Sequence, residues 1–307
     1  MSNPVKKYDV IIIGGGPAGF SAGIYTARAR RSTLLIEKSA IGGQVINTWQ
    51  VENYPGIESV SGIDLTQAMY RQAKKFGIEE IYTEVTGVEI KGASKVVRTS
   101  QGDYAAGAII IAGGLERQKL GVPGEDEYIG KGVSYCATCD GAFFRDKAVI
   151  MVGGGDTAIT EALELTRFAS MVTVIHRRNE LRATKILQEK IMAEPKIKFL
   201  WDSAIEEITG DTLVKQVRVR NVKTGQISTI DASGVFISVG FKPNTGYLKG
   251  VVDMDDNGSI ITNGRMETSA PGILAAGDVR SGSIRQLVAA AGDGAVAAIS
   301  AEKYLSG

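Results

Sequence analysis

The chain contains only two cysteines, and they stand three positions apart in Cys136-Ala137-Thr138-Cys139. Two thiols at this spacing can form a redox-active disulfide, supply half of a zinc site, or be buried without a chemical role. One glycine-rich sequence precedes the pair and another follows it. Between two nucleotide-binding sequences, the pair is interpreted as a dithiol that exchanges electrons with bound cofactors.

A structural zinc ion requires four ligands, and the chain offers no further cysteine and one histidine, His176. We therefore expect no metal. The apolar run after the polar N-terminal segment is too short for a signal peptide. A cytoplasmic, reducing environment is expected, and there a CxxC pair is more often catalytic or metal-binding than structural.

The residue after the pair, Asp140, is the candidate proton donor of the dithiol. A departing thiolate must be protonated, and a carboxyl group in a partly desolvated site is suited to this role. The one histidine lies where a cofactor is expected and is assigned to that cofactor. Alternatively, Asp140 caps a helix that starts after the cysteines; the two roles are compatible.

The first glycine-rich sequence has the pattern of a dinucleotide-binding turn. An apolar strand precedes it and an Ala-rich helix follows, so the glycines permit a tight turn and close approach of the backbone to a pyrophosphate. Glu37 ends the next apolar run, where a carboxylate can bind a ribose diol. Alternatively, the glycines form a structural turn. The predicted binding residues are Gly14, Gly16, Pro17, Ala18, Gly19 and Glu37.

The second glycine-rich sequence repeats the same unit with a different charge. From Gly14 to Glu37 and from Gly153 to His176 the chain advances 23 positions in each case. Guanidinium groups bind a 2′-phosphate that a carboxylate would repel, so this unit is predicted to prefer NADP(H). Alternatively, the arginines form a solvated basic surface. The predicted binding residues are Gly153, Gly155, Asp156, Thr157, His176, Arg177, Arg178 and Arg182.

These elements predict an α/β protein with two Rossmann-like dinucleotide-binding domains. The C-terminal segment, an apolar strand within residues 272–278 and a helix over about 284–304, cannot form a domain alone. We therefore expect it to return to the first domain. The prediction is a domain of residues 1–114 and 245–307, interrupted by an inserted domain of residues 115–244.

The composition excludes several broad classes of function. The 307 residues include 35 basic and 34 acidic side chains, a net charge of +1, which argues against general binding to nucleic acid or a membrane surface. The longest apolar stretch, residues 287–299, contains Asp293 and reads as a packed helix.

Together these motifs closely resemble the low-molecular-weight thioredoxin reductases over nearly the whole chain. Those enzymes are homodimers that use FAD and NADPH. The resemblance rests on Gly14-Gly15-Gly16-Pro17-Ala18-Gly19, Gly42-Gly43-Gln44, Glu52-Asn53-Tyr54-Pro55-Gly56, Cys136-Ala137-Thr138-Cys139-Asp140-Gly141, Gly153-Gly154-Gly155-Asp156-Thr157-Ala158, His176-Arg177-Arg178, Ala276-Gly277-Asp278-Val279 and Arg285-Gln286.

The resemblance implies that electrons pass from NADPH to FAD, then to the cysteine pair and to oxidised thioredoxin. It implies that Cys139 faces the flavin and Cys136 attacks the partner disulfide. Phe143 and Phe144 match an exposed aromatic pair that docks thioredoxin, although core packing is the alternative. FAD would be bound by the first fingerprint with Glu37, Gly43, Gln44, Asn53, Gly277, Asp278, Arg285 and Gln286.

One segment, Ala112-Gly113-Gly114, departs from the Ala-Thr-Gly usual in the family. We expect this departure to change the flexibility of the chain there or a contact of the flavin domain. The inserted domain carries both the cysteines and the NADPH fingerprint, so we expect it to rotate between half-reactions. Alternatives are a ferredoxin-dependent relative, a dithiol oxidase of small molecules and a non-catalytic redox sensor.

Overall fold

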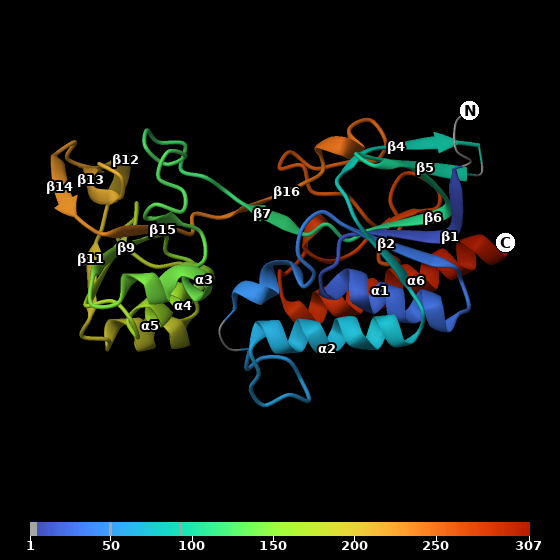
Figure 1. The fold of residues 1–307 in the computed structure, drawn as a ribbon, viewed down its shortest axis with the longest axis horizontal. Coiled ribbons are helices and arrows are strands. Elements are labelled where there is room, and N and C mark those ends of the chain that lie inside the picture. The colour runs from blue at the N-terminus through green and yellow to red at the C-terminus, as the bar shows by residue number, and fades with distance from the viewer. Residues whose placement is uncertain (1–4, 49–50, 93) are drawn as a thin grey trace. The chain divides into compact units, whose positions relative to one another are not determined.

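The computed structural model describes residues 5–48, 51–92 and 94–307. The chain forms two compact units (Figure 1). Unit 1 combines residues 1–116 with 242–307, and unit 2 consists of residues 117–241. The second unit is thus an insertion into the first.

The sheet of unit 1 has a parallel centre and an antiparallel extension. Its strand order is β3-β2-β1-β6-β5-β4, and β17 pairs with β6 in parallel. The central strands are almost continuously apolar because both of their faces are covered. The strands are β1 (Lys6–Ile13), β2 (Thr33–Glu37), β3 (Glu79–Tyr82), β4 (Val85–Lys91), β5 (Ser94–Thr99), β6 (Gly102–Ile111) and β17 (Ile273–Ala275).

One face of this sheet is covered by α1 (Pro17–Arg28), α2 (Gly62–Lys75) and α6 (Leu287–Ser306), as Figure 1 shows. Pro17 occupies the first helical position of α1, where its fixed φ favours helix initiation and no amide donor is lost. Short 3₁₀ helices, η1 (Gly43–Asn47), η3 (Gly246–Leu248) and η4 (Gly277–Val279), complete the unit. The C-terminal strand and helix return to unit 1, as the sequence predicts.

A buried lysine fastens α6 to the sheet. Lys95 on β5 is 1% exposed, and its ammonium donates hydrogen bonds of 2.8 Å to the Gly107 carbonyl oxygen and to the Tyr304 hydroxyl. The ammonium also lies 4.4 Å from the centre of the Tyr304 ring. Buried charge is tolerated only with such partners, so these contacts fix the last turns of α6.

Unit 2 is built around a five-stranded parallel sheet in the order β11-β10-β9-β15-β8. These strands are β8 (Val133–Ser134), β9 (Ala148–Val152), β10 (Met171–Ile175), β11 (Ile197–Leu200) and β15 (Gly234–Ile237). One apolar core contains the sheet and its helices, and another joins it to an antiparallel sheet of three strands. The remaining elements are α3 (Ala137–Asp140), η2 (Gly141–Phe144), α4 (Asp156–Leu165), α5 (Lys185–Met192), β12 (Ser203–Gly210), β13 (Val214–Asn221) and β14 (Ile227–Asp231).

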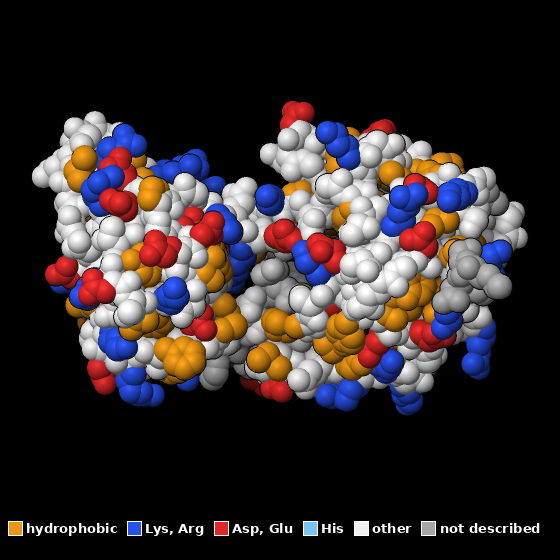
Figure 2. All heavy atoms as spheres, turned by 45° about the horizontal axis from the view of Figure 1, so that its top comes forward, with side chains coloured by type: hydrophobic (Ala, Val, Ile, Leu, Met, Phe, Trp, Pro, Cys, Tyr) orange, Lys and Arg blue, Asp and Glu red, His pale blue; other side chains and the backbone are white. Residues whose placement is uncertain are grey.

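The chain passes between the units along β7 (Leu115–Arg117) and β16 (Phe241–Pro243), which pair in a two-stranded sheet. On the face seen in Figure 2, basic and acidic side chains are intermingled, without an extended area of one sign. In the part of the chain that the structure describes, no helix combines the length and apolarity needed to cross a membrane.

Candidate functional sites

The first fingerprint is a turn between β1 and α1 that excludes side chains. Gly14 has a φ of +114°, and a Cβ there would collide with the Ala112 carbonyl oxygen. A Cβ at Gly19 would collide with the carbonyl oxygen of Gly14. The backbone of Gly16 lies close to that of Gly43 in η1, since a Cβ on Gly43 would be 3.4 Å from the Gly16 Cα. The loop therefore presents bare backbone at the start of a helix, as a pyrophosphate requires.

Glu37, at the end of β2, reaches back to this loop. Its Oε2 accepts a hydrogen bond of 2.7 Å from the Gly15 amide, and its Oε1 accepts one of 2.9 Å from the Ser39 amide. Each carboxylate oxygen has a second lone pair, so the group can still accept from a ribose diol. The two amides hold the carboxylate in a fixed orientation.

Two predicted flavin ligands of unit 1, Asn53 and Gln286, are in direct contact. The Asn53 amide donates a hydrogen bond of 3.2 Å to Gln286 Oε1, and the Gln44 amide donates one of 3.3 Å to the Leu115 carbonyl oxygen. Arg285 has a φ of +55°. A non-glycine residue in the left-handed region stores strain that often marks a binding site.

Asp278 lies in η4, half-buried, and its burial raises the pKa of its carboxyl group. A hydrogen bond of 3.2 Å from the Ser283 hydroxyl opposes that effect. The sequence reasoning did not identify Asp293, which supports this segment: its Oδ2 accepts from the Gly277 amide at 3.1 Å and from Arg280 Nε at 2.7 Å. Asp293 belongs to a second Gly-Asp pair, Gly292-Asp293 in α6, and this repeat was the signal that the sequence offered.

Gly113, which stands where the family usually has threonine, lies next to the buried hydroxyl of Tyr247. The Tyr247 hydroxyl is buried and has no hydrogen-bond partner among the described residues. A Cβ on Gly113 would lie 3.9 Å from that hydroxyl. The threonine usual in the family would therefore fit beside Tyr247, and glycine leaves the phenol without that neighbour.

The second fingerprint has the same form between β9 and α4. Gly153 has a φ of +146°, and a Cβ there would collide with the Ser238 carbonyl oxygen. Around Gly155 a Cβ would meet nothing within 4 Å, so this backbone is open to a ligand. Asp156 instead accepts a hydrogen bond of 2.7 Å from the Thr184 amide, which ties α4 to the start of α5. Thr157 is exposed in the first turn of α4.

His176 lies beneath this loop. It is 5% exposed, and a Cβ added to Gly154 would lie 2.5 to 2.6 Å from three atoms of its ring. Burial lowers the pKa of the imidazole, and the nearby Arg182, Arg178 and Arg177 lower it further. Its Nε2 has no hydrogen-bond partner among the described residues. The histidine is thus a neutral support of the loop at pH 7 rather than a cation on the basic surface.

The three arginines that follow His176 are exposed. None of them is in an ion pair with any described residue. The Arg182 amide donates a hydrogen bond of 2.7 Å to the Gly154 carbonyl oxygen, which holds this basic segment against the fingerprint. Three uncompensated guanidinium groups at the end of β10 fit the 2′-phosphate of NADP(H). The glycine turns, the held carboxylate of Glu37 and these arginines thus fit one dinucleotide in each unit.

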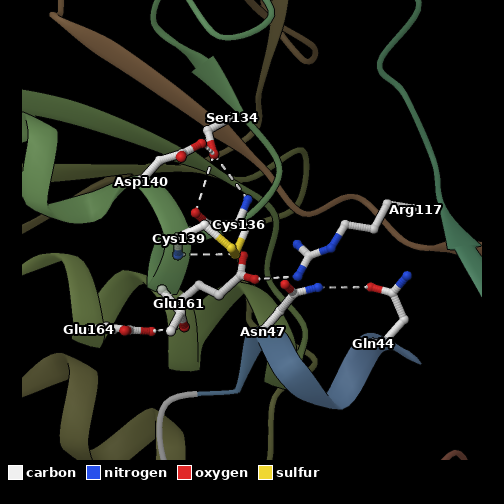
Figure 3. Close-up of a disulfide and its surroundings, with 10 residues drawn as sticks. Gln44, Asn47, Arg117, Ser134, Cys136, Cys139, Asp140, Glu161 and Glu164 are labelled. Carbon is white, nitrogen blue, oxygen red and sulfur yellow. Dashed lines mark hydrogen bonds and ion pairs between the residues drawn. A yellow bond between two sulfur atoms is a disulfide. The ribbon is translucent and has the colours of Figure 1, made fainter. Parts of the chain in front are cut away.

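Cys136 and Cys139 form a disulfide with a Cα–Cα distance of 5.4 Å (Figure 3). Cys136 is the N-cap of the one-turn helix α3, and its sulfur accepts a hydrogen bond of 3.1 Å from the Cys139 amide. Cys139 is the more exposed of the two. No group of three or more His, Cys, Asp or Glu residues in the described ranges could hold a metal ion.

Asp140 does not cap the following helix, because its side chain makes no capping hydrogen bond to η2. Instead, its Oδ2 accepts a hydrogen bond of 2.7 Å from the hydroxyl of Ser134. The alternative interpretation of Asp140 as an N-cap is therefore wrong. Its carboxyl group faces back toward the strand that leads into the cysteines.

Two buried glutamates on α4 lie beneath the cysteine segment, and the sequence reasoning missed both. Glu164 accepts a hydrogen bond of 2.7 Å from the Thr138 hydroxyl, and Glu161 accepts one of 2.6 Å from Arg117. Burial raises the pKa of both carboxyl groups, and in each case the hydrogen bond opposes the shift. Thr138 thereby anchors the CxxC turn to the nucleotide-binding helix.

The two adjacent phenylalanines differ in exposure, which corrects one expectation. Phe143 is 74% exposed, whereas Phe144 is 9% exposed and packs edge-on to Phe236 at 5.2 Å between ring centres. The prediction that Phe144 belongs to an exposed docking pair is therefore wrong. In a 3₁₀ helix successive side chains point about 120° apart, so the two rings face different surroundings.

Comparison with known proteins assigns the chain to a family. Residues 8–294 match the pyridine nucleotide-disulphide oxidoreductase family. Thioredoxin reductases of Listeria monocytogenes and Bacillus subtilis are both 48% identical to this chain; the alignments cover 99% and 98% of it and 96% and 95% of those proteins. The structure of Lactococcus lactis thioredoxin reductase is 46% identical, with a TM-score of 0.95, covering 97% of this chain and 99% of that one.

The contact between Gly154 and His176 can be tested by replacing Gly154 and, as a control, the adjacent Gly155. Gly154→Ala forces a methyl group into the imidazole, so we expect it to lower the free energy of unfolding by about 1 to 3 kcal/mol. Gly155→Ala meets no protein atom and should leave unfolding unchanged while weakening NADPH binding. Urea unfolding and fluorescence titration with NADPH measure the two effects. Equal stability of the two variants would contradict the packing role of Gly154.

Proposed function

This chain belongs to the pyridine nucleotide-disulphide oxidoreductases, and we propose that it is an NADPH-dependent thioredoxin-disulfide reductase. Electrons pass from NADPH to FAD, to the Cys136–Cys139 disulfide and then to oxidised thioredoxin. The observation that carries the proposal is the disulfide itself: it joins the N-cap of the one-turn helix α3 to the exposed Cys139, in the unit that holds the basic fingerprint.

FAD and NADPH are the cofactors, and the chain offers one fitting turn for each. Bound FAD supplies a two-electron relay. In unit 1 the bare loop, the fixed Glu37 carboxylate and the segments around Asn53 and Asp278 would hold it. In unit 2 the second fingerprint would hold NADPH. Arg177, Arg178 and Arg182, which form no ion pair within the described ranges, support a preference for the phosphorylated nucleotide over a ferredoxin donor.

In the exchange with thioredoxin, Cys136 attacks the substrate disulfide as a thiolate and forms a mixed disulfide. Cys139 then attacks Cys136, which releases reduced thioredoxin and restores the internal disulfide. Asp140 provides the acid that protonates a departing sulfur and later recovers its proton from solvent. The hydrogen bond from the Cys139 amide to Cys136 Sγ supports this assignment, since it stabilises negative charge on Cys136.

Replacement of the attacking sulfur tests this function. Cys136→Ser should leave reduction of the flavin by NADPH unchanged and reduce thioredoxin-disulfide turnover by roughly 10⁴-fold or more, as for other lost nucleophiles. Anaerobic stopped-flow absorbance follows the first step and release of thioredoxin thiols the second. Full thioredoxin reduction by the variant would refute the role of Cys136. No bleaching of the wild-type flavin by NADPH would favour a different electron donor.

We propose that thioredoxin docks at the surface around Phe143, which is the exposed member of the aromatic pair. Phe143→Ala should raise KM for thioredoxin by about 10-fold, as for loss of an exposed aromatic anchor, without altering flavin reduction. Phe144→Ala is the matched contrast and should instead lower the free energy of unfolding by about 3 to 5 kcal/mol. An unchanged KM in the Phe143 variant would contradict docking of thioredoxin at this surface.

The resemblance to the family also supports a homodimer. An exposed apolar stripe on α6, formed by Val288, Val296 and Ile299, is the candidate contact surface. Sedimentation equilibrium of the purified protein distinguishes dimer from monomer, and a monomer at micromolar concentration would count against this assembly.

We propose that unit 2 rotates relative to unit 1 between half-reactions. Its support is the connection: the chain crosses twice, and the residues before β7 and β16 are Gly114 with φ +59° and Gly240 with φ +131°. These left-handed glycines allow backbone rotation that other residues resist.

A photocleavable cross-link between the two units tests the rotation. We expect the cross-link to bring thioredoxin-dependent NADPH oxidation to background and illumination to restore it. The control is the same reagent attached at one end only. Steady-state activity that the cross-link does not change would rule out rotation as a step of turnover.

A further inference from the structure

Ser134 is the residue by which the sheet of unit 2 meets the cysteine segment. It is the last residue of β8, where it pairs with Phe236 of β15, and it is 5% exposed. Strand β8 is thus a rigid base from which the chain turns into Cys136. A buried hydroxyl at this point has to find hydrogen-bond partners, and it finds them in the catalytic residues.

The Ser134 hydroxyl oxygen contacts three polar atoms (Figure 3). It accepts a hydrogen bond of 3.0 Å from the Cys136 amide and donates one of 2.7 Å to Asp140 Oδ2. The Cys136 carbonyl oxygen is a second possible acceptor at 3.3 Å. A hydroxyl has one proton and two lone pairs, so only one of the two acceptors can receive its proton at a time.

The two possible acceptors correspond to the two protonation states of Asp140. When Asp140 is a carboxylate, Ser134 donates to it. When Asp140 is protonated, its own hydroxyl donates to the Ser134 oxygen, and the serine proton turns to the Cys136 carbonyl oxygen. The Cys136 amide remains a donor to Ser134 in both states. The Ser134 hydroxyl therefore has a donor and an acceptor before and after Asp140 gives up its proton.

We propose that Ser134 is a positioning residue for the redox chemistry, one that holds the Asp140 carboxyl in place in both of its protonation states. The inference rests on the proposed function. In the step concerned, a thiolate of a reducing dithiol bonds to one sulfur of the pair, the sulfur–sulfur bond breaks, and the departing sulfur takes the proton of the Asp140 carboxyl. Asp140 becomes a carboxylate and regains a proton from solvent. Without the Ser134 hydroxyl, Asp140 would lose the hydrogen bond of 2.7 Å that its Oδ2 accepts and that fixes the carboxyl group.

The other charged groups next to this segment have partners of their own. Helix α4, which packs against α3, carries Glu161 and Glu164, and these accept from Arg117 and Thr138 respectively. The hydroxyl of Ser134 is therefore the contact that distinguishes Asp140 from the neighbouring carboxylates.

The test uses a small dithiol, dithiothreitol, so that it does not depend on NADPH, FAD reduction or thioredoxin. The full-length protein in its FAD-bound form is mixed with dithiothreitol, and appearance of the two protein thiols is followed after rapid quenching. The small dithiol is oxidised to its cyclic disulfide while the Cys136–Cys139 disulfide is reduced, and the departing protein sulfur still needs a proton.

We expect Ser134→Ala to slow this reduction roughly 10- to 100-fold, as for loss of a hydrogen bond to a charged group. Ser134→Thr keeps the hydroxyl and suits a strand, so it should recover most of the rate. Ser203→Ala is the matched control, because Ser203 is also a buried serine of unit 2 and donates only to the Trp201 carbonyl oxygen. Should Ser134→Ala fail to fold, Ser134→Val removes the same hydroxyl and suits a strand.

A double-mutant cycle separates positioning from a general effect on the fold. In an Asp140→Asn background, Ser134→Ala should cause no further loss, because the acid it positions is already absent. A wild-type rate in Ser134→Ala, or an equal loss in both backgrounds, would overturn the inference. Failure of the wild-type protein to reduce thioredoxin with NADPH would overturn the proposed function and leave this result standing.

Discussion

In both units the residue at the carboxyl end of the second parallel strand contacts the glycine loop that follows the first strand: Glu37 ends β2, and His176 comes directly after β10. Gly15 and Glu37, and likewise Gly154 and His176, are separated by 22 positions, and each pair is in contact. In unit 1 the contact is an amide donating to a carboxylate. In unit 2 it is bare backbone against an imidazole. The rest of each nucleotide site depends on this meeting, because it fixes both the loop and the charge at the end of the strand.

The different solutions follow from the charge that each site has to accept. An amide-bound carboxylate at Glu37 gives unit 1 a fixed acceptor for ribose hydroxyls and would repel a further phosphate. A neutral, buried imidazole fills the same place in unit 2 without occupying the surface, which leaves that surface to three exposed arginines. His176 thus supports the glycine loop by packing, whereas the arginines that follow it supply positive charge at the surface.

The sequence was sufficient to predict the parallel strands at the centre of each unit, the insertion and the return of the C-terminal helix. Runs such as Val10–Ile13 and Val149–Val152 are apolar throughout because both faces are buried, and glycine patterns mark the turns. It could not predict contacts that depend on the path of the chain between distant elements, such as Thr138 with Glu164 or Arg117 with Glu161. The sequence also could not predict which of Phe143 and Phe144 is exposed, because the two residues are alike in type and differ only in the direction that η2 gives their side chains.

The insertion has a consequence for the synthesis of the chain. All residues of unit 2 have left the ribosome once Phe241 emerges, whereas unit 1 lacks β17 and α6 until almost the last codon. Until then the part of β6 from Ile109 to Ile111 lacks its partner on the side away from β1, and the face of α1 that packs on α6 is uncovered. Domains fold as units in the order in which they are completed. The unit that begins first is therefore finished last, and a chain cut short before residue 273 contains a complete redox unit attached to an incomplete flavin unit.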